Sequence, residues 1–284
     1  MKKIEKVSSW LCDHLALFSC PVCHEKFIRV NNQQLVCVNG HRLNINKHGY
    51  VYFLQKGVKS EYDREMLLAR RQLLSAGLFR KIITAINEEL GTTPQSVLDV
   101  GSGEGTPLFQ LQQLRNRRDE TYVGFDISRP GVQLATQLDP ELFFCLADLR
   151  QLPFQNNSFS TIIELFSPSD YREFHRVLKT NGKVIKVIPT GNYLHEMRSL
   201  LYPVDDKHQK YDNTAVKKLF ANHFGATHVK NVQYRFTIPK SLRSSMIEMS
   251  PLHWGKNARR LTEAEINQLT TVTVDVDLLI GKQN

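Results

Sequence analysis

Three cysteines and one histidine form two close pairs near the beginning of this 284-residue chain. Cys20 and Cys23 make the first pair and Cys37 and His41 the second, in the pattern C-x2-C-x13-C-x3-H. This spacing is close to that of zinc ribbons and fingers, in which each close pair fixes two ligands of a tetrahedral zinc ion. The alternative is that the four residues are unrelated, and the regular spacing argues against it. Because four protein ligands close the coordination sphere, the pattern predicts a structural zinc ion and places the chemistry elsewhere.

The segments around these four residues predict a small module at residues 1–54. Apolar residues on both sides of the polar stretch 31–33 are typical of a short β-hairpin between the two pairs. The apolar residues within 1–18 recur at helical spacing, which predicts an amphipathic leading helix. The zinc ribbon is expected at 19–54, and a strand at 49–54 is expected to close it.

A second motif begins at residue 97, where an apolar run ends in a turn with three glycines. The run reads Val-Leu-Asp-Val-Gly-Ser-Gly-Glu-Gly, with the glycines at Gly101, Gly103 and Gly105. Glycines allow a backbone to approach a ligand more closely than other residues do. The pattern differs from the dinucleotide fingerprint G-x-G-x-x-G. It suits a nucleoside without a pyrophosphate, such as S-adenosylmethionine.

Two acids follow later apolar segments of the chain. Asp126 ends the run 121–126, where a carboxylate can accept hydrogen bonds from both hydroxyls of a ribose. Asp148 follows the run 142–147 and can accept from the amino group of adenine. Each acid alone is equally well explained as a solvated loop carboxylate. Their order after successive strands, together with the glycine turn, favours a cofactor site.

The remaining pattern predicts an α/β fold. Apolar segments alternate with helical stretches, which indicates a parallel sheet covered on both faces. Ligands bind such sheets beyond the carboxyl ends of the strands, where all three motifs lie. The last two strands are expected at 229–238 and 270–280, one of them antiparallel. We therefore divide the chain into the leading helix and zinc-binding ribbon at 1–54, a linker and helices at 55–95, and an S-adenosylmethionine-dependent domain at 96–284.

The charge of the chain is positive and unevenly distributed. The formal net charge is +9 and the pI is near 9.3. Residues 1–95 hold 14 Lys and Arg against 8 Asp and Glu, so this third carries +6 of the excess. A basic zinc module beside a nearly balanced domain suggests a polyanionic partner, most simply a nucleic acid. A generally basic cytosolic protein is the simpler alternative.

The sequence predicts no membrane segment and no disulfide framework. No apolar run approaches the length that spans a bilayer, and residues 1–18 lack the continuous apolar core of a signal peptide. Of five cysteines, Cys12 and Cys145 are not part of the expected zinc site. We therefore expect the chain to work in a reducing cytoplasm.

These motifs together resemble the bacterial 23S rRNA guanine-N1 methyltransferase family, which includes members linked to tylosin-type macrolide resistance. The resemblance rests on the ribbon, the Gly-Tyr-Val strand, an Ala-Arg-Arg helix, Gly-Ser-Gly-Glu-Gly, Gly-Phe-Asp-Ile-Ser, Phe-Ser-Pro and Met-Ser-Pro-Leu, and it covers essentially the whole chain. The segments 164–174 and 184–189 look like the Gram-positive branch. The zinc ribbon in front is what narrows the resemblance from the methyltransferase superfamily to this family.

The resemblance implies a seven-stranded, Rossmann-like class I methyltransferase fold with an N-terminal zinc-ribbon domain. It implies transfer of a methyl group from S-adenosylmethionine to guanine N1 in a hairpin loop of 23S rRNA, which the zinc domain helps to hold. It places cofactor contacts at Gly103 and Glu104 and around Phe79 and Tyr193, and it suggests a homodimer.

The chain departs from the family pattern near the expected cofactor site. Thr106 and Pro107 replace an aromatic pair, Tyr193 replaces a histidine, and Phe79 replaces a tyrosine and so lacks its hydroxyl. These changes bear on the affinity for the cofactor and on the choice of nucleotide.

Two other functions remain open, and no catalytic residue is assigned. One is a methyltransferase of the same fold that acts on a small molecule, and the other is an rRNA-binding protein without turnover. Glu164 and Asp170 flank the Phe-Ser-Pro motif, where methyltransferases often contact the target base. Glu164 is equally well explained as an inward strand residue and Asp170 as a helix cap.

Overall fold

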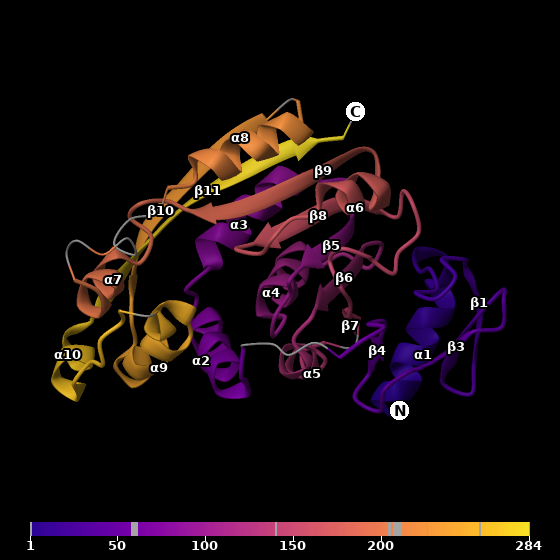
Figure 1. Cartoon of the computed structure of the whole chain (residues 1–284), viewed down its shortest axis with the longest axis horizontal. Coiled ribbons are helices and arrows are strands. Elements are labelled where there is room, and N and C mark those ends of the chain that lie inside the picture. Colours follow the sequence, from indigo (N-terminus) through magenta and orange to yellow (C-terminus); the bar gives the residue numbers. More distant parts are fainter. Residues whose placement is uncertain are drawn as a thin grey trace.

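The computed structural model describes residues 2–57, 62–139, 141–203, 206, 212–225, 227–255 and 257–283. An eight-stranded sheet runs through the molecule (Figure 1). From one edge to the other its strands are β10 (Thr227–Thr237), β11 (Thr271–Lys282), β9 (Leu178–Pro189), β8 (Phe159–Leu165), β5 (Ser96–Val100), β6 (Thr121–Asp126), β7 (Phe143–Leu146) and β4 (Tyr50–Tyr52). The neighbours from β9 to β4 pair in parallel, whereas β11 is antiparallel to both β9 and β10. The seven strands from β5 to β11 confirm the predicted α/β fold, including the antiparallel strand near its end.

Helices cover both faces of this sheet because successive strand residues point to opposite sides. In β5, Val97 packs with α3 (Arg80–Leu90) and α4 (Thr106–Arg115), whereas the next residue, Leu98, belongs to the core on the other face. That second core includes side chains of α1 (Lys3–Asp13), α6 (Tyr171–Val177) and α8 (Thr214–His223). Burial on both faces explains why the central strands read as continuous apolar runs.

A separate three-stranded sheet lies beside the four clustered residues of the N-terminal part, of which Cys37 ends its second strand. Its strands β1 (Phe27–Asn31), β2 (Gln34–Cys37) and β3 (Arg42–Asn44) are antiparallel. Asn32 and Gln33 join β1 to β2, and both have positive φ angles, 48° and 60°. Two left-handed residues are what a tight hairpin turn of matching twist requires. The predicted hairpin is confirmed.

The strand expected to close the ribbon joins the large sheet instead. Tyr50 and Val51 of β4 pair in parallel with Phe144 and Cys145 of β7, at the edge of the sheet. This pairing is possible because β7 would otherwise be an edge strand with unpaired backbone groups. In Figure 1 the indigo ribbon therefore lies against the β4 end of the sheet.

Aromatic side chains extend this junction into a shared core. Trp10 of α1 stacks on Phe143 of β7, with ring centroids 4.9 Å apart and planes at 6°. Phe18 is fully buried and contacts the rings of Phe143 and Phe154 at 5.2 and 5.6 Å. The N-terminal part and the large sheet are thus joined by a hydrophobic core as well as by the chain.

The remaining elements lie at the other end of the molecule and around the linker. The expected helix after Pro239 is a 3-10 turn, η3 (Lys240–Leu242), followed by α9 (Arg243–Glu248), and η4 (Pro251–Trp254) and α10 (Glu263–Gln268) come next. α2 (Arg64–Ser75) contacts this insertion through Ser245, which donates to Gln72 at 2.8 Å. α7 (His195–Leu201) packs beside β11. The expected linker at 55–63 lies partly outside the described residues.

Within the described ranges, every helix falls short of the length or the apolar character that crossing a bilayer requires.

We predict that Phe18→Ala lowers the free energy of unfolding of the whole chain by about 3–5 kcal/mol, because it empties a site in the shared core. Denaturant unfolding followed by circular dichroism and by tryptophan fluorescence should give one coincident transition at a lower midpoint. Val22→Ala is the control, since Val22 is 58% exposed and should change stability by no more than about 0.5 kcal/mol. Two separate transitions would show that the two parts do not share a core.

Candidate cofactor cavity and metal centre

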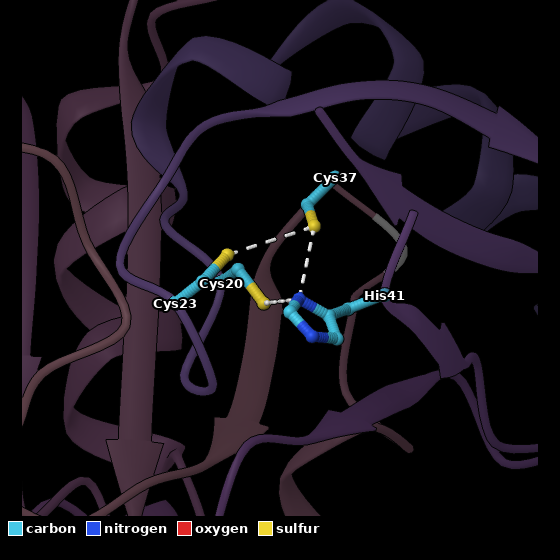
Figure 2. A group of neighbouring side chains, drawn as sticks. All are labelled: Cys20, Cys23, Cys37 and His41. Carbon is cyan, nitrogen blue, oxygen red and sulfur yellow. Dashed lines mark hydrogen bonds between the residues drawn. The ribbon is translucent and has the colours of Figure 1, made fainter. Parts of the chain in front are cut away.

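The structure brings the four clustered N-terminal residues together around a common centre (Figure 2). The Sγ atoms of Cys23 and Cys37 are 3.8 Å apart, and Nδ1 of His41 is 3.7 Å from Sγ of Cys20 and 3.4 Å from Sγ of Cys37. The edges of a tetrahedron built from ordinary Zn–S and Zn–N bonds measure roughly 3.5–3.8 Å. Both the donor set and its spacing therefore fit a zinc ion. A backbone hydrogen bond from Glu25 lowers the pKa of Cys23 to about 6, which favours the thiolate that binds a metal.

Backbone hydrogen bonds form a tight turn within each of the two ligand pairs. In the first pair, the N–H of His24 donates to the carbonyl of Cys20 at 2.8 Å. In the second, the N–H of Cys37 donates to the carbonyl of His41, and the N–H of Gly40 donates to that of Cys37, both at 3.0 Å. Gly40 has φ +81°, a left-handed conformation that favours glycine.

A cavity of about 720 Å³ lies at the carboxyl ends of β5, β6, β7 and β8. Gly101 and Gly103 line it, with φ angles of +67° and +55°. A Cβ atom at Gly101 would lie 2.8 Å from Cβ of Ser167, so only glycine fits there. Pro107, one of the two residues that replace the family's aromatic pair, also lines this cavity.

Both predicted acids lie in the wall of this cavity. The carboxylate of Asp126 accepts from the N–H of Gly103 and the N–H of Ser128, each at 2.7 Å, and burial raises its pKa. Asp148 accepts from the N–H of Arg150 at 2.9 Å. Since a carboxylate offers about four acceptor positions, Asp126 still has acceptor capacity toward the cavity.

Three further residues of this cavity were not predicted as site residues. Asp99 is buried in the motif itself, and burial, with the nearby charge of Asp126, raises its pKa to about 7. Arg70 of α2 lies near Asp99 and Asp126, and its charge lowers the pKa of each carboxyl against the effect of burial. The hydroxyl of Ser102 is buried and has no hydrogen-bond partner among the described residues. Buried charges and an unpaired hydroxyl beside a glycine turn fit a polar, nucleoside-sized ligand. The only sequence signals for these residues were the motif and the Ala-Arg-Arg helix that contain them.

Two of the expected cofactor contacts lie beneath the glycine turn. Glu104 is buried, pairs with Arg71 of α2 at 2.9 Å and accepts from the hydroxyl of Thr106 at 2.6 Å. A Cβ atom at Gly105 would lie 2.8 Å from Ala135, so this glycine serves packing against α5 (Arg129–Ala135). Neither residue lines the cavity among the described residues, and the ion pair turns Glu104 toward α2.

Phe79 and Tyr193, the other two expected contacts, line a neighbouring cavity of about 550 Å³. The two cavities share the loop 166–169. The ring of Phe166 lies between the two aromatics, 5.6 Å from Phe79 and 5.1 Å from Tyr193. The structure therefore separates an aromatic cavity from the glycine-lined one and joins them at this loop.

Comparison with known proteins gives two family matches. A family model described as "Methyltransferase domain" matches residues 93–249, and one described as "RlmA, N-terminal", a zinc ribbon, matches residues 18–59. The first covers the glycine turn and both acids, and the second covers all four clustered residues.

Individual relatives match over nearly the whole chain. YxjB of Bacillus subtilis, which carries the provisional name 23S rRNA (guanine-N(1)-)-methyltransferase, is 35% identical over 278 residues, or 94% of this chain and 97% of its own. The 23S rRNA (guanine(748)-N(1))-methyltransferase of Streptomyces fradiae is 26% identical over 272 residues, or 92% and 95%. Among solved structures, phosphoethanolamine N-methyltransferase 2 of Haemonchus contortus with S-adenosyl-L-methionine matches with a TM-score of 0.50 and 14% identity, over 81% of this chain and 61% of that one, and shows the fold alone.

We predict that the purified protein holds about one zinc ion per chain and that Cys23→Ser loses it, because three ligands bind zinc far more weakly than four. Elemental analysis of both proteins after dialysis against a chelator measures this. Cys12→Ser, at an exposed cysteine outside the cluster, should keep its zinc. Full zinc occupancy in Cys23→Ser would contradict the site.

We predict that Asp126→Asn weakens S-adenosylmethionine binding about tenfold or more, since losing a hydrogen bond to a charged acceptor is worth about 1.5–3 kcal/mol. Isothermal titration calorimetry gives the affinity. Asp119→Asn, at an exposed acid that pairs with Arg117, is the matched control and should bind normally. An unchanged affinity in Asp126→Asn would mean that Asp126 only caps the backbone.

Proposed function

The chain belongs to the 23S rRNA (guanine-N1)-methyltransferase family, and from this premise we propose which part of the structure performs each step. It is an S-adenosylmethionine-dependent rRNA methyltransferase with an N-terminal zinc ribbon. We propose that the glycine-lined cavity binds the cofactor and that the aromatic cavity receives a guanine of 23S rRNA. The observation that carries this proposal is that the two cavities meet at the loop 166–169.

Polar groups along the first cavity suit the parts of the cofactor. Asp126 can accept from the ribose hydroxyls, and Asp148 from the adenine amino group. Arg70 and Asp99 offer one charge of each sign for the carboxylate and ammonium of the methionine end. S-adenosylmethionine, when bound, supplies a methyl group that its sulfonium already activates. The protein then has mainly to align the guanine and exclude water.

The second cavity suits an unpaired base. Phe79, Phe166 and Tyr193 present aromatic rings close to one another, and a base stacked on such a ring gains about 1–3 kcal/mol. A guanine whose N1 is engaged in base pairing cannot be methylated there, so the target must lie in a loop or be flipped out of a helix. A guanine in the aromatic cavity would lie on one side of Phe166 and the cofactor on the other. This arrangement would bring the base next to the methyl group.

The charge of the ribbon supports binding to the phosphates of the RNA. Lys26, Arg29, Arg42 and Lys47 are all exposed on this module. Cationic side chains on phosphates release counterions and provide affinity that depends on salt. We further propose a homodimer, a cytoplasmic place of action and a part in macrolide resistance, all of which follow from the family resemblance.

We predict that the enzyme transfers tritium from labelled S-adenosylmethionine to 23S rRNA and not to a metabolite extract, and that mass mapping places the methyl on a loop guanine. Transfer to the extract alone would instead indicate a methyltransferase of small molecules. Binding of RNA and cofactor without any transfer would indicate a protein without turnover.

We also predict that Tyr193→Ala lowers the rate per bound RNA or the RNA affinity by about 5- to 150-fold, as the loss of one stacking partner implies. Cofactor affinity should stay unchanged, and Tyr193→Phe, which keeps the ring, is the control. Calorimetry with the cofactor and single-turnover assays with RNA separate the two effects. A loss of cofactor affinity instead would make Tyr193 a cofactor contact, as the resemblance implied.

A further inference from the structure

A buried ion pair lies at the floor of the aromatic cavity. Glu164 of β8 is 0% exposed and Lys186 of β9 is 6% exposed, and Nζ of Lys186 is 3.4 Å from Oε1 of Glu164. The two strands pair in parallel with these residues opposite each other. Removing two charges from water costs several kcal/mol per ion, and apolar residues would often stabilise the same space better. A buried charged pair at a ligand cavity is therefore a candidate for function.

Ser169 connects this pair to both cavities. Its hydroxyl donates to the carboxylate of Glu164, at 2.9 Å from Oε1 and 3.1 Å from Oε2, and accepts from Nζ of Lys186 at 2.9 Å. A hydroxyl has one hydrogen and two lone pairs, so one lone pair of Ser169 is left for the neighbouring Tyr171 hydroxyl or for a group in the cavities. Ser169 lines both cavities, whereas Glu164 lines neither among the described residues. A group in the cavities can thus reach Glu164 through Ser169.

The loop that carries Ser169 has a defined position. Lys186 also donates to the carbonyl oxygen of Ser167 at 3.0 Å, and the N–H of Phe166 donates to the carbonyl of Val187 at 3.2 Å. On its other side the loop presses against Gly101, where a Cβ atom would lie 2.8 Å from that of Ser167. The Ser169 hydroxyl is thereby held where the proposed cofactor and guanine meet.

Resting on the proposed function, we propose that Ser169 and Glu164 relay the proton that guanine N1 must lose, while Lys186 is the positioning residue that holds both. The N1–H bond breaks as its proton moves to the Ser169 oxygen, and the hydroxyl's own proton moves to the Glu164 carboxylate. N1 forms its bond to the methyl carbon as the bond from that carbon to sulfur breaks. The positive charge of the sulfonium and the negative charge of Glu164 disappear together, and Glu164 later returns its proton to solvent.

The electrostatics around Glu164 suit this role. Burial raises its pKa to about 7, while the ammonium of Lys186 and the hydroxyl of Ser169 lower it against burial. Tyr171 of α6 also faces this group: burial and, to a smaller extent, the charge of Glu164 raise the pKa of its phenol, while a hydrogen bond with Ser169 lowers it. A base with a pKa near neutrality transfers protons efficiently. Because only the ionised form can accept a proton, the rate of transfer should rise with pH through about 7 and level off above it.

We test this relay by single-turnover methyl transfer to 23S rRNA, as a function of pH, with the wild-type enzyme, Glu164→Gln and Ser169→Ala. Both variants should be slower by roughly 100-fold or more, as the loss of a general base implies, and should lose the rise near pH 7. Their affinities for cofactor and RNA should stay within about twofold of wild type. Glu173→Gln is the matched control, because Glu173 is also a buried glutamate in an ion pair, with Arg176, and should keep the wild-type rate and pH profile.

A measurement on the free enzyme completes the test. In a carbon-13 NMR titration of the glutamate carboxyls, the Glu164 signal is identified by its absence from the spectrum of Glu164→Gln. In the wild-type enzyme this signal should titrate near pH 7. It should titrate at higher pH in Lys186→Met, because burial then acts without the opposing ammonium. The relay is overturned if folded Glu164→Gln or Ser169→Ala transfers the methyl group at the wild-type rate. It is also overturned if Glu164 titrates near the ordinary pKa of a glutamate. Failure of the wild-type enzyme to methylate rRNA would instead overturn the proposed function, and the titration would still report on Glu164.

Discussion

The site depends on the close approach of two backbone turns at the ends of neighbouring strands. β5 and β8 pair in parallel, so the turns that follow them emerge at the same edge of the sheet. At Gly101 the missing Cβ leaves room for Ser167, whose own Cβ would otherwise be 2.8 Å away. The loop 166–169 therefore lies directly against the glycine turn. This contact helps to shape both cavities, because the loop lines each of them, as Tyr62 and Arg70 also do.

Buried charge is concentrated around the same contact. Asp99 lies at the end of β5 on the side of the first cavity, and Glu164 lies at the end of β8 beneath the second. Burial raises the pKa of each to about 7, and each has one cation near it, Arg70 and Lys186 respectively. Such groups oppose stability, because the core must remove them from water. Their presence on both sides of one loop supports the proposal that this region serves the methyl transfer.

The zinc ribbon is tied to this chemistry through the edge of the sheet. β4 pairs with β7 at the edge of the sheet, and the N–H of Phe53 donates to the carbonyl of Leu146, the last residue of β7. Two residues later the chain reaches Asp148 in the wall of the first cavity. A metal that folds the ribbon therefore also supports the strand that positions a proposed cofactor contact. The predicted module at 1–54 is thus coupled to the large sheet through a strand of its own.

The sequence by itself determined the features that depend on short spacing. Two close pairs of ligands, a glycine turn after an apolar run, and acids after successive strands each lie within a few residues, so their geometry follows from local backbone rules. The zinc cluster, the hairpin and the succession of strands along the chain were predictable for this reason, and Asp126 and Asp148 lie in the cavity wall.

Only the tertiary structure decided the rest. Phe79 and Tyr193 lie more than a hundred positions apart in the chain, and their place beside Phe166 depends on how α3 and the segment before α7 pack on the sheet. Glu104 follows the glycine turn in the motif, and its ion pair with Arg71 depends on how α2 packs beside that turn. The pairing of Glu164 with Lys186 likewise depends on the register between two strands. Spacing along the chain determines the local backbone conformation of a turn. Side-chain partners from distant segments determine the direction in which each functional side chain points.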